Sequence, residues 1–227
     1  LHIPEKYGGP GLGSMEDVIV NEELAWGDPG FATAAYATAL ACAPIITGAT
    51  DEQKDIWLRK VAEEGALASY AVTEPGAGSD LAACKTHAAR DGDDYVINGA
   101  KMWITGAGHA DFFFVLAKTD IDAGYRGMSG FIVESDADGF SLGKKESNMG
   151  QRCSDTRSIT FDDVRVPASN LIGGSESGGW MNAMKAFDMS RPNIAAHATG
   201  LARAAYEHAL RYSGERMSFG KPLHKHQ

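Results

Sequence analysis

The sequence has few cysteines and fewer positive than negative charges. Its three cysteines, Cys42, Cys84 and Cys153, are far apart and form no C-x-x-C pair, which argues against a disulfide framework or a structural zinc site. Lysine and arginine number 21 against 30 aspartates and glutamates, a net charge of −9. This charge argues against nucleic acid or an anionic membrane surface as a general partner. No apolar stretch approaches the roughly 20 residues of a membrane helix, so we expect no membrane span.

Neither end of the chain has the signal of a natural terminus. It begins at Leu1, not at a methionine, and stops at Gln227 within a charged segment that has no helix stop signal. We therefore expect a fragment, in which the absence of a targeting peptide has no meaning. With 227 residues, of which 44% are hydrophobic, the chain is long enough for two or three small domains.

The first third of the chain is predicted to be helical. One helix is expected over residues 14–27, with Ser14 as its cap, and an alanine-rich helix over residues 31–47. A third follows the capping box Thr50-Asp51-Glu52-Gln53 and stops at Gly65.

Strand patterns replace helical ones at residue 67. The segments "LASYAVT", "FFFVLAKT", "GFIVES" and "SITFDDVRVP" read as strands, and "DDYVINGAKMWIT" as two strands joined by a hairpin at Asn98-Gly99. Helical periodicity returns after "GGSESGGW". We expect a multidomain α and β protein, with a helical domain at 1–66, an antiparallel β domain at 67–176 and a second helical domain starting at 177–227.

The stretch "YAVTEPGAGSD", residues 70–80, ends a strand in a glycine-rich turn. Gly76 and Gly78 allow close backbone approach to a ligand, and Ser79 and Asp80 could cap or bind. The stretch lacks the lysine of a phosphate-binding loop and is not G-x-G-x-x-G. On form alone, an ordinary β-turn is favoured over a phosphate cradle.

Three further stretches could bind a ligand, and each also has a simpler interpretation. In "MWITGAGHAD", alternation predicts Trp103 and Thr105 on one side of a strand, which suits a flat heteroaromatic ring or a packed core. In "FDMSRPN", Asp188 and Arg191 form a local ion pair or a ligand clamp. In "ERMSFGKPLHKHQ", a basic cluster binds phosphate or is a solvated turn, and its two histidines make a poor metal pair.

Taken together and in this order, these stretches resemble the acyl-CoA dehydrogenase family, most closely its medium-chain branch. "AVTEPGAGSDLAA" matches that family's first signature without departure, and "NGAKMWITGAGHAD", "NMGQRCSDTRSITFDDVRVP", "AFDMSRP" and "RMSFGKPLHKHQ" stand where the family has them. The resemblance covers essentially all of the chain. It implies an N-terminal helical domain, a central antiparallel β-barrel-like domain and the start of a C-terminal four-helix bundle.

The resemblance also implies residue roles, carried over where the motifs match. The strand around Tyr70 would run along the edge of an FAD flavin, with Trp103 beside the ring and Thr105 near N5. The C-terminal residues would reach the FAD of a neighbouring subunit, which implies a homo-oligomer, a dimer of dimers. The implied cofactor-binding residues are Tyr70, Val72, Thr73, Gly78, Ser79, Trp103, Ile104, Thr105, Arg216, Ser218, His226 and Gln227, and the implied substrate-binding residues are Ser79, Asp188 and Arg191.

The implied reaction converts an acyl-CoA thioester into a trans-2-enoyl-CoA, as in fatty-acid β-oxidation. A desolvated glutamate would remove the α-proton while the β-hydrogen leaves as hydride to the flavin, and an electron-transferring flavoprotein would take the electrons. Most of the family has this glutamate beyond the position of Gln227; a minority has it where this chain has Ser190. We expect no catalytic base and no metal in this chain, and an inactive fragment.

Several alternatives stay open on the sequence. Tyr36 would line the end of the acyl pocket or simply pack in its helix, so the acyl chain length is not fixed. An acyl-CoA oxidase or flavin monooxygenase on the same fold, or a non-catalytic flavoprotein, is the alternative function. The compartment would be the mitochondrial matrix in a eukaryote and the cytoplasm in a bacterium.

Overall fold

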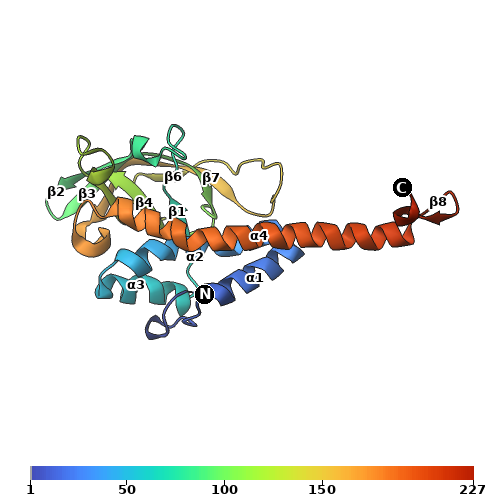
Figure 1. The fold of residues 1–227 in the computed structure, drawn as a ribbon. Coiled ribbons are helices and arrows are strands. Elements are labelled where there is room, and N and C mark those ends of the chain that lie inside the picture. The colour runs from blue at the N-terminus through green and yellow to red at the C-terminus, as the bar shows by residue number, and fades with distance from the viewer. Residues whose placement is uncertain (1) are drawn as a thin grey trace.

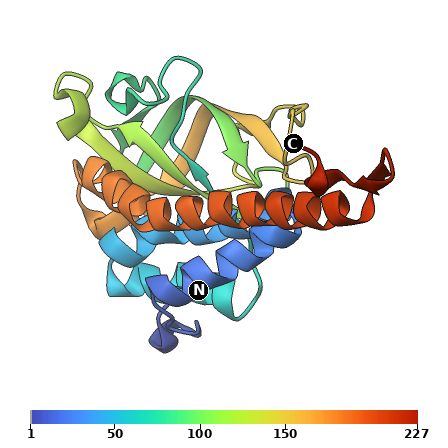
Figure 2. The same ribbon diagram turned by 45° about the vertical axis from the view of Figure 1, so that its right-hand side comes forward.

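The computed structural model describes residues 2–227, and it places a curled β-sheet over a layer of helices. One long helix, α4 (Gly179–Glu215), crosses between them, and its C-terminal part projects beyond the body to a small hairpin (Figure 1). Seen from the side, the sheet lies on one side of the N-terminal half of α4 while α1 and α2 lie on the opposite side (Figure 2). The predicted order of helices, sheet and helix is confirmed.

The three N-terminal helices begin at local capping signals. Helix α3 (Asp51–Ala62) starts with the predicted capping box: the Gln53 N–H donates to Thr50 Oγ1 at 3.2 Å, and the Thr50 N–H donates to Gln53 Oε1 at 3.0 Å. Helix α1 (Ser14–Gly27) has Gly13 as its cap, and the Gly13 N–H donates to Glu16 Oε2 at 3.0 Å. The prediction of Ser14 as the cap is therefore wrong.

Helix α2 (Pro29–Gly48) begins at the Asp28 cap and is the central helix of this layer. It is long and apolar enough to cross a membrane by length and composition, so the expectation that no segment reaches that length is wrong. The helix contacts α1, α3, α4 and strand β1 (Ala68–Ala71), and buries Ala32, Ala41 and Ile45 completely. These contacts account for its apolar composition.

The sheet has seven strands in the order β1-β4-β2-β3-β7-β6, with β5 paired to β4. The strands beyond β1 are β2 (His87–Asp91), β3 (Asp94–Thr105), β4 (Phe112–Lys118), β5 (Met128–Glu134), β6 (Phe140–Leu142) and β7 (Thr156–Pro167). Most pairings are antiparallel, as predicted. The expectation of a wholly antiparallel sheet is wrong for β4, which pairs parallel to β1 along four residues and meets β2 in parallel at His87 and Lys118.

The predicted hairpin at Asn98-Gly99 is wrong, because both residues lie inside the continuous 12-residue strand β3. The turn lies earlier, at Gly92 and Asp93, where Asp91 pairs with Asp94. Gly99 has φ +147°, and the register with β7 shifts between Ile97 and Gly99. A Cβ at Gly99 would lie 2.5 Å from Thr86 Oγ1, so glycine is required here by a close approach within the sheet.

Both faces of the sheet are buried, as strand β4 shows. Phe112, Phe114 and Leu116 pack against the helices, whereas Phe113 and Val115 fill the concave side of the curled sheet. All five side chains are fully buried, and each contributes about 2 kcal/mol through the hydrophobic effect. This double core makes a rigid frame for the ends of β1 and β3.

Replacing Gly99 with alanine is expected to lower the free energy of unfolding by about 2 kcal/mol or more, because the new Cβ clashes with Thr86 and the positive φ disfavours a side chain. Gly76→Ala is the matched control, since a Cβ at Gly76 would meet no atom within 4 Å. Urea unfolding of both variants measures the difference. Equal stabilities would contradict the close packing at Gly99.

Candidate functional site

The ends of β1 and β3 meet α2 and α4 at a cavity of about 190 Å³. Six residues predicted to bind a cofactor line it together, and three further side chains complete the wall. The predicted residues are Tyr70, Val72, Thr73, Trp103, Ile104 and Thr105, and the others are Ala37, Leu40 and Phe187. The cavity is thus bounded by aromatic and aliphatic groups with two threonine hydroxyls.

Trp103 has an unusual backbone conformation for an aromatic residue. Its φ is +62°, and 56% of its surface is exposed. It lies in a β-bulge, because Lys101 pairs with Ile159 but the next registered pair is Ile104 with Arg157. Such a conformation costs about 1–3 kcal/mol and persists only where the surrounding structure fixes it. Trp103 and Thr105 line one cavity as predicted, although the bulge interrupts the regular alternation from which that was inferred.

The strand end beneath the cavity is fixed by contacts on both sides. The Met102 N–H donates to the Thr73 carbonyl at 2.9 Å, and the Ser69 hydroxyl donates to the Thr105 carbonyl at 2.7 Å. Tyr70 stacks on Phe114 with ring centroids 5.2 Å apart and meets Phe187 edge-on at 5.8 Å. Burial raises the pKa of the Tyr70 hydroxyl, so it stays protonated at neutral pH.

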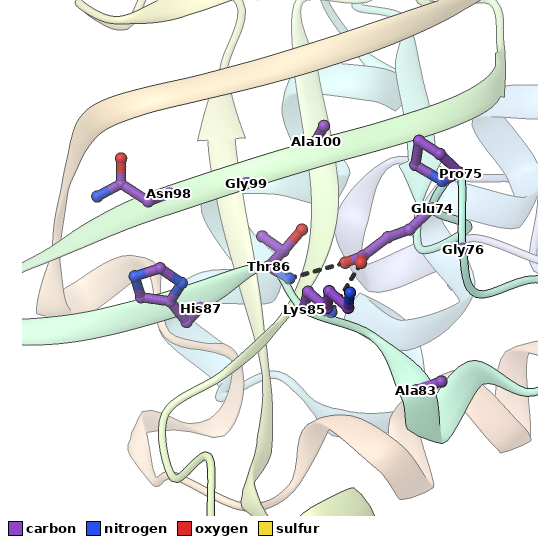
Figure 3. Close-up of a pocket in the computed structure, with 10 residues that line it drawn as sticks. All are labelled: Glu74, Pro75, Gly76, Ala83, Lys85, Thr86, His87, Asn98, Gly99 and Ala100. Atoms are coloured by element: carbon purple, nitrogen blue, oxygen red, sulfur yellow. Dashed lines mark hydrogen bonds between the residues drawn. The ribbon is translucent and has the colours of Figure 1, made fainter.

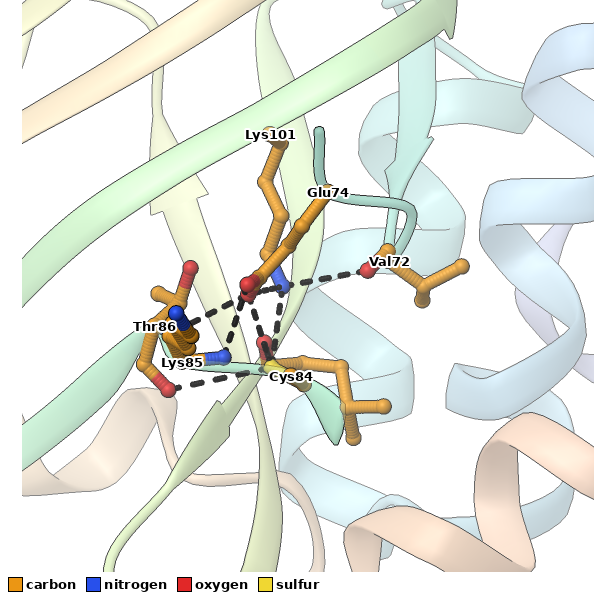
Figure 4. Close-up of polar contacts among 7 residues, drawn as sticks. Val72, Glu74, Cys84, Lys85, Thr86 and Lys101 are labelled. Carbon is orange, nitrogen blue, oxygen red and sulfur yellow. Dashed lines mark hydrogen bonds and ion pairs between the residues drawn. The ribbon is translucent and has the colours of Figure 1, made fainter. Parts of the chain in front are cut away.

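A buried ionic cluster lies directly behind the strand end (Figure 4). The Lys101 ammonium, fully buried, lies 2.9 Å from Glu74 Oε1, and the Glu74 carboxylate is 7% exposed. That carboxylate also accepts from the backbone N–H groups of Lys85 and Thr86 at 2.7 and 2.9 Å, and from the Cys84 thiol at 2.7 Å. Glu74 is therefore a structural residue.

The pKa of Glu74 reflects two opposing effects. Burial by itself would raise it, but the Lys101 charge and the hydrogen bonds to the carboxylate hold the pKa at about 2. Burial raises the pKa of the adjacent Cys84 thiol to about 11, so at neutral pH the thiol is a hydrogen-bond donor. Glu74 carries its charge throughout the physiological range and is a weak base.

The remaining predicted residues lie outside the cavity lining. Gly78 and Ser79 are exposed in the loop after Glu74. Asp188 and Arg191 form an ion pair with each other on α4, and each side chain is 70% exposed. Arg216, Ser218, His226 and Gln227 lie at the projecting end of α4, around the hairpin of β8 (Met217–Ser218) and β9 (Lys221–Pro222) (Figure 1).

A second cavity, of about 370 Å³, is larger than the first and lies on the other side of Glu74 (Figure 3). It is lined by Glu74, Pro75, Gly76, Ala83, Lys85, Thr86, His87, Asn98, Gly99 and Ala100. None of the implied cofactor- or substrate-binding residues belongs to this set, although Gly76, which was predicted to allow close backbone approach to a ligand, does. Size alone would therefore have selected a different site from the one that the motifs indicate.

Tyr36 lines a third cavity, of about 220 Å³, between α1 and α2. Its hydroxyl accepts from the side-chain amide of Asn193, which also donates to the Asp17 carboxylate. Its neighbour Ala37 lines the cavity of Tyr70 and Trp103 instead. Tyr36 therefore belongs to a buried polar network behind that cavity.

Sequence reasoning missed Lys101 and the three lining residues Ala37, Leu40 and Phe187. A signal for Lys101 was present. Lys101 is separated by an even number of positions from Tyr95 and Ile97, which are buried, and alternate residues of a strand face the same side. Nothing local marks Ala37 and Leu40 among the many alanines of their helix. Within residues 2–227, no three His, Cys, Asp or Glu side chains gather as metal ligands would.

Comparison with known proteins gives three matching domain families along the chain. Residues 1–65 match the N-terminal domain of acyl-CoA dehydrogenases, residues 69–164 the middle domain and residues 177–227 the C-terminal domain. A probable medium-chain specific acyl-CoA dehydrogenase, mitochondrial, of Caenorhabditis briggsae is 47% identical over 229 residues, which cover 99% of this chain and 56% of that protein. The chain thus spans a little over half the length of the curated relatives it matches.

Two solved structures show the same fold. Butyryl-CoA dehydrogenase from Megasphaera elsdenii has a TM-score of 0.94 and 41% identity, covering 99% of this chain and 60% of that one. An acyl-CoA dehydrogenase complexed with FAD from Bacillus anthracis has a TM-score of 0.91 and 36% identity, covering 98% and 38% of the two chains. The expected fold class is confirmed.

The depressed pKa of Glu74 predicts a dependence of stability on pH. Because the folded pKa of about 2 lies below the ordinary value of 4.5, the stabilisation is complete above about pH 4.5 and is lost as pH falls toward 2. The full effect is of order 3 kcal/mol. Between pH 6 and pH 3, the free energy of unfolding measured in urea is expected to fall more for the wild type than for Glu74→Gln. An equal fall in the two proteins would contradict the ionic role of Glu74.

Proposed function

This chain belongs to the acyl-CoA dehydrogenase family, and from that premise we propose that it is the larger part of an FAD-dependent enzyme that desaturates acyl-CoA thioesters. The product would be a trans-2-enoyl-CoA, formed by loss of one hydrogen from each of the α and β carbons. The observation that carries the proposal is the cavity at the ends of β1 and β3, where six motif residues meet.

The donor set of the cavity fits a flavin. Trp103 contributes an exposed aromatic side chain from a strained conformation, and Thr73 and Thr105 are lining residues whose hydroxyl groups can form hydrogen bonds. A flat heteroaromatic ring needs these two kinds of contact, an apolar surface for its face and hydrogen bonds for its edge. Tyr70, Val72 and Ile104 complete the wall, and Gly78 and Ser79 would approach the pyrophosphate. When bound, FAD supplies hydride acceptance for this reaction.

The residues around the cavity support a proton acceptor that lies outside this chain. The nine residues that line the cavity include no carboxylate, and the nearby Glu74 is held by Lys101 with a pKa of about 2. Ser190, the position used by a minority of the family, is buried, and its hydroxyl donates to the Phe187 carbonyl at 3.0 Å. We therefore propose that the chain is a fragment and that the base is a glutamate beyond Gln227.

The proposed contacts with the substrate and with a neighbouring subunit come from two different regions of the chain. Asp188 and Arg191 follow Phe187 by one and four positions on α4 and remain solvent-accessible, which supports their contact with acyl-CoA, together with Ser79. Arg216, Ser218, His226 and Gln227 lie in or beside the β8–β9 hairpin, which stands at the projecting C-terminal end of α4 (Figure 1). This placement supports their binding the FAD of a neighbouring subunit in a dimer of dimers.

Further parts of the proposal concern the whole protein. The domains would run over 1–66, 67–176 and 177–227. Electrons would pass to an electron-transferring flavoprotein, in the mitochondrial matrix of a eukaryote or the cytoplasm of a bacterium.

The full-length protein tests the proposed activity. Anaerobic addition of butyryl-CoA or octanoyl-CoA is expected to bleach the visible absorption of its FAD, because the thioester reduces the flavin. Absence of bleaching with either substrate would reject the dehydrogenase function. Rapid turnover with O₂ as the sole acceptor would instead favour an acyl-CoA oxidase. A non-acidic residue at the expected base position beyond Gln227 would also count against catalysis.

Trp103→Gly is expected to weaken FAD binding without lowering the stability of the fold. Glycine removes the positive-φ strain, so stability should be unchanged or higher, while loss of the aromatic face should raise the Kd for FAD about tenfold. Ser177→Gly is the matched control, since Ser177 is exposed with φ +71° and does not line the cavity. Fluorescence titration with FAD measures Kd. An unchanged Kd in Trp103→Gly would place the flavin elsewhere.

A further inference from the structure

We propose that Lys101 is a positioning residue for the flavin-edge strand, an inference that rests on the proposed function. It does not line the cavity. Its ammonium lies behind the wall, where it joins the end of β1 to the glycine loop and to β3 (Figure 4). Through these contacts it sets the geometry of groups that do face the cavity.

Three acceptors surround the Lys101 ammonium. It donates to the Val72 carbonyl at 3.1 Å, to Glu74 Oε1 at 2.9 Å and to the Cys84 sulfur at 3.5 Å. The ammonium has three hydrogens, so these contacts use its full donor capacity. Because the side chain is fully buried, these contacts are shielded from bulk water.

Val72 and Thr73 are held by consecutive residues of β3. Lys101 binds the Val72 carbonyl through its side chain, and Met102 binds the Thr73 carbonyl through its N–H at 2.9 Å. Both carbonyls belong to the segment that continues β1 past its last paired residue, Ala71. Because these two residues are not paired as part of strand β1, the two hydrogen bonds fix the position of Thr73 in the cavity wall.

The same lysine ends the regular pairing of β3 before the bulge. Lys101 is the last residue paired with β7 before the bulge, and Ile104 is the first paired residue after it. Both are buried, so the two residues between them must bulge outward, and Trp103 takes its positive φ there. A shift of Lys101 would therefore move Trp103 as well as Thr73.

Stability alone does not explain a buried ion pair at this point. Replacing such a pair by apolar groups of similar volume is often neutral or stabilising, whereas removing one partner is strongly destabilising. A methionine at position 101 would fill a similar volume but would leave the Val72 carbonyl without a donor. Stability thus does not account for the hydrogen bond from Lys101 to the Val72 carbonyl, and we assign the positioning role to this bond.

The test compares three variants of the full-length, FAD-loaded protein. Lys101→Met removes the donor and strands the Glu74 charge. Glu74→Gln/Lys101→Met removes the donor without stranding a charge. Lys85→Met is the matched control, because Lys85 is exposed and contacts Glu74 through its backbone N–H. Each is measured for thermal midpoint, Kd for FAD, KM for butyryl-CoA and the rate of flavin reduction per bound FAD.

A positioning role predicts that the double variant regains most of the thermal midpoint lost by Lys101→Met. Its reduction rate per bound FAD should stay at least about tenfold below that of the wild type, with KM changed less than about twofold. Lys85→Met should match the wild type throughout.

A wild-type rate in the double variant would overturn the inference and leave Lys101 a purely structural residue. Failure of the double variant to fold would overturn it too, because the two roles would then be inseparable. If the wild type itself bound no FAD or was not reduced by acyl-CoA, the proposed function would fail instead.

Discussion

The ion pair between Glu74 and Lys101 joins the two strand ends that form the candidate site. Glu74 begins the glycine loop that follows β1, and Lys101 is the last residue of β3 before its bulge. Because both charges are buried, each depends on the other to offset the cost of leaving water. The loop, the bulge and the strand end can therefore adopt this arrangement only together, which gives the cavity a defined shape before any ligand enters.

The double core supplies the rigidity on which this pair depends. Strand β4 packs one row of side chains against the helices and the other into the curl of the sheet. Its parallel pairing with β1 places Tyr70 beside Phe114, and α4 brings Phe187 against the same ring. The helix and sheet layers thus meet in an aromatic contact at the cavity, since Tyr70 and Phe187 both line it.

Local signals in the sequence predicted the local structure well. The capping box at Thr50 was recognised because all of its partners lie within four residues, and most strands were recognised by composition. The prediction of a hairpin at Asn98-Gly99 was wrong because Gly99 is needed for a different reason. A side chain there would clash with Thr86, which directly precedes the neighbouring strand β2. The motifs placed six residues at one cavity. They could not reveal Ala37 and Leu40, which differ from other helix residues only by their position in the fold, or the bulge that orients Trp103.

Helix α4 runs unbroken from Phe187 at the cavity to Glu215 beside the terminal hairpin. At about 1.5 Å per residue, these 28 steps correspond to a rod about 42 Å long. No single cofactor molecule of dinucleotide size could touch both ends. Under the proposed function, the cavity and the terminal hairpin of one chain would therefore contact two different FAD molecules, and the length of α4 would set the distance between them.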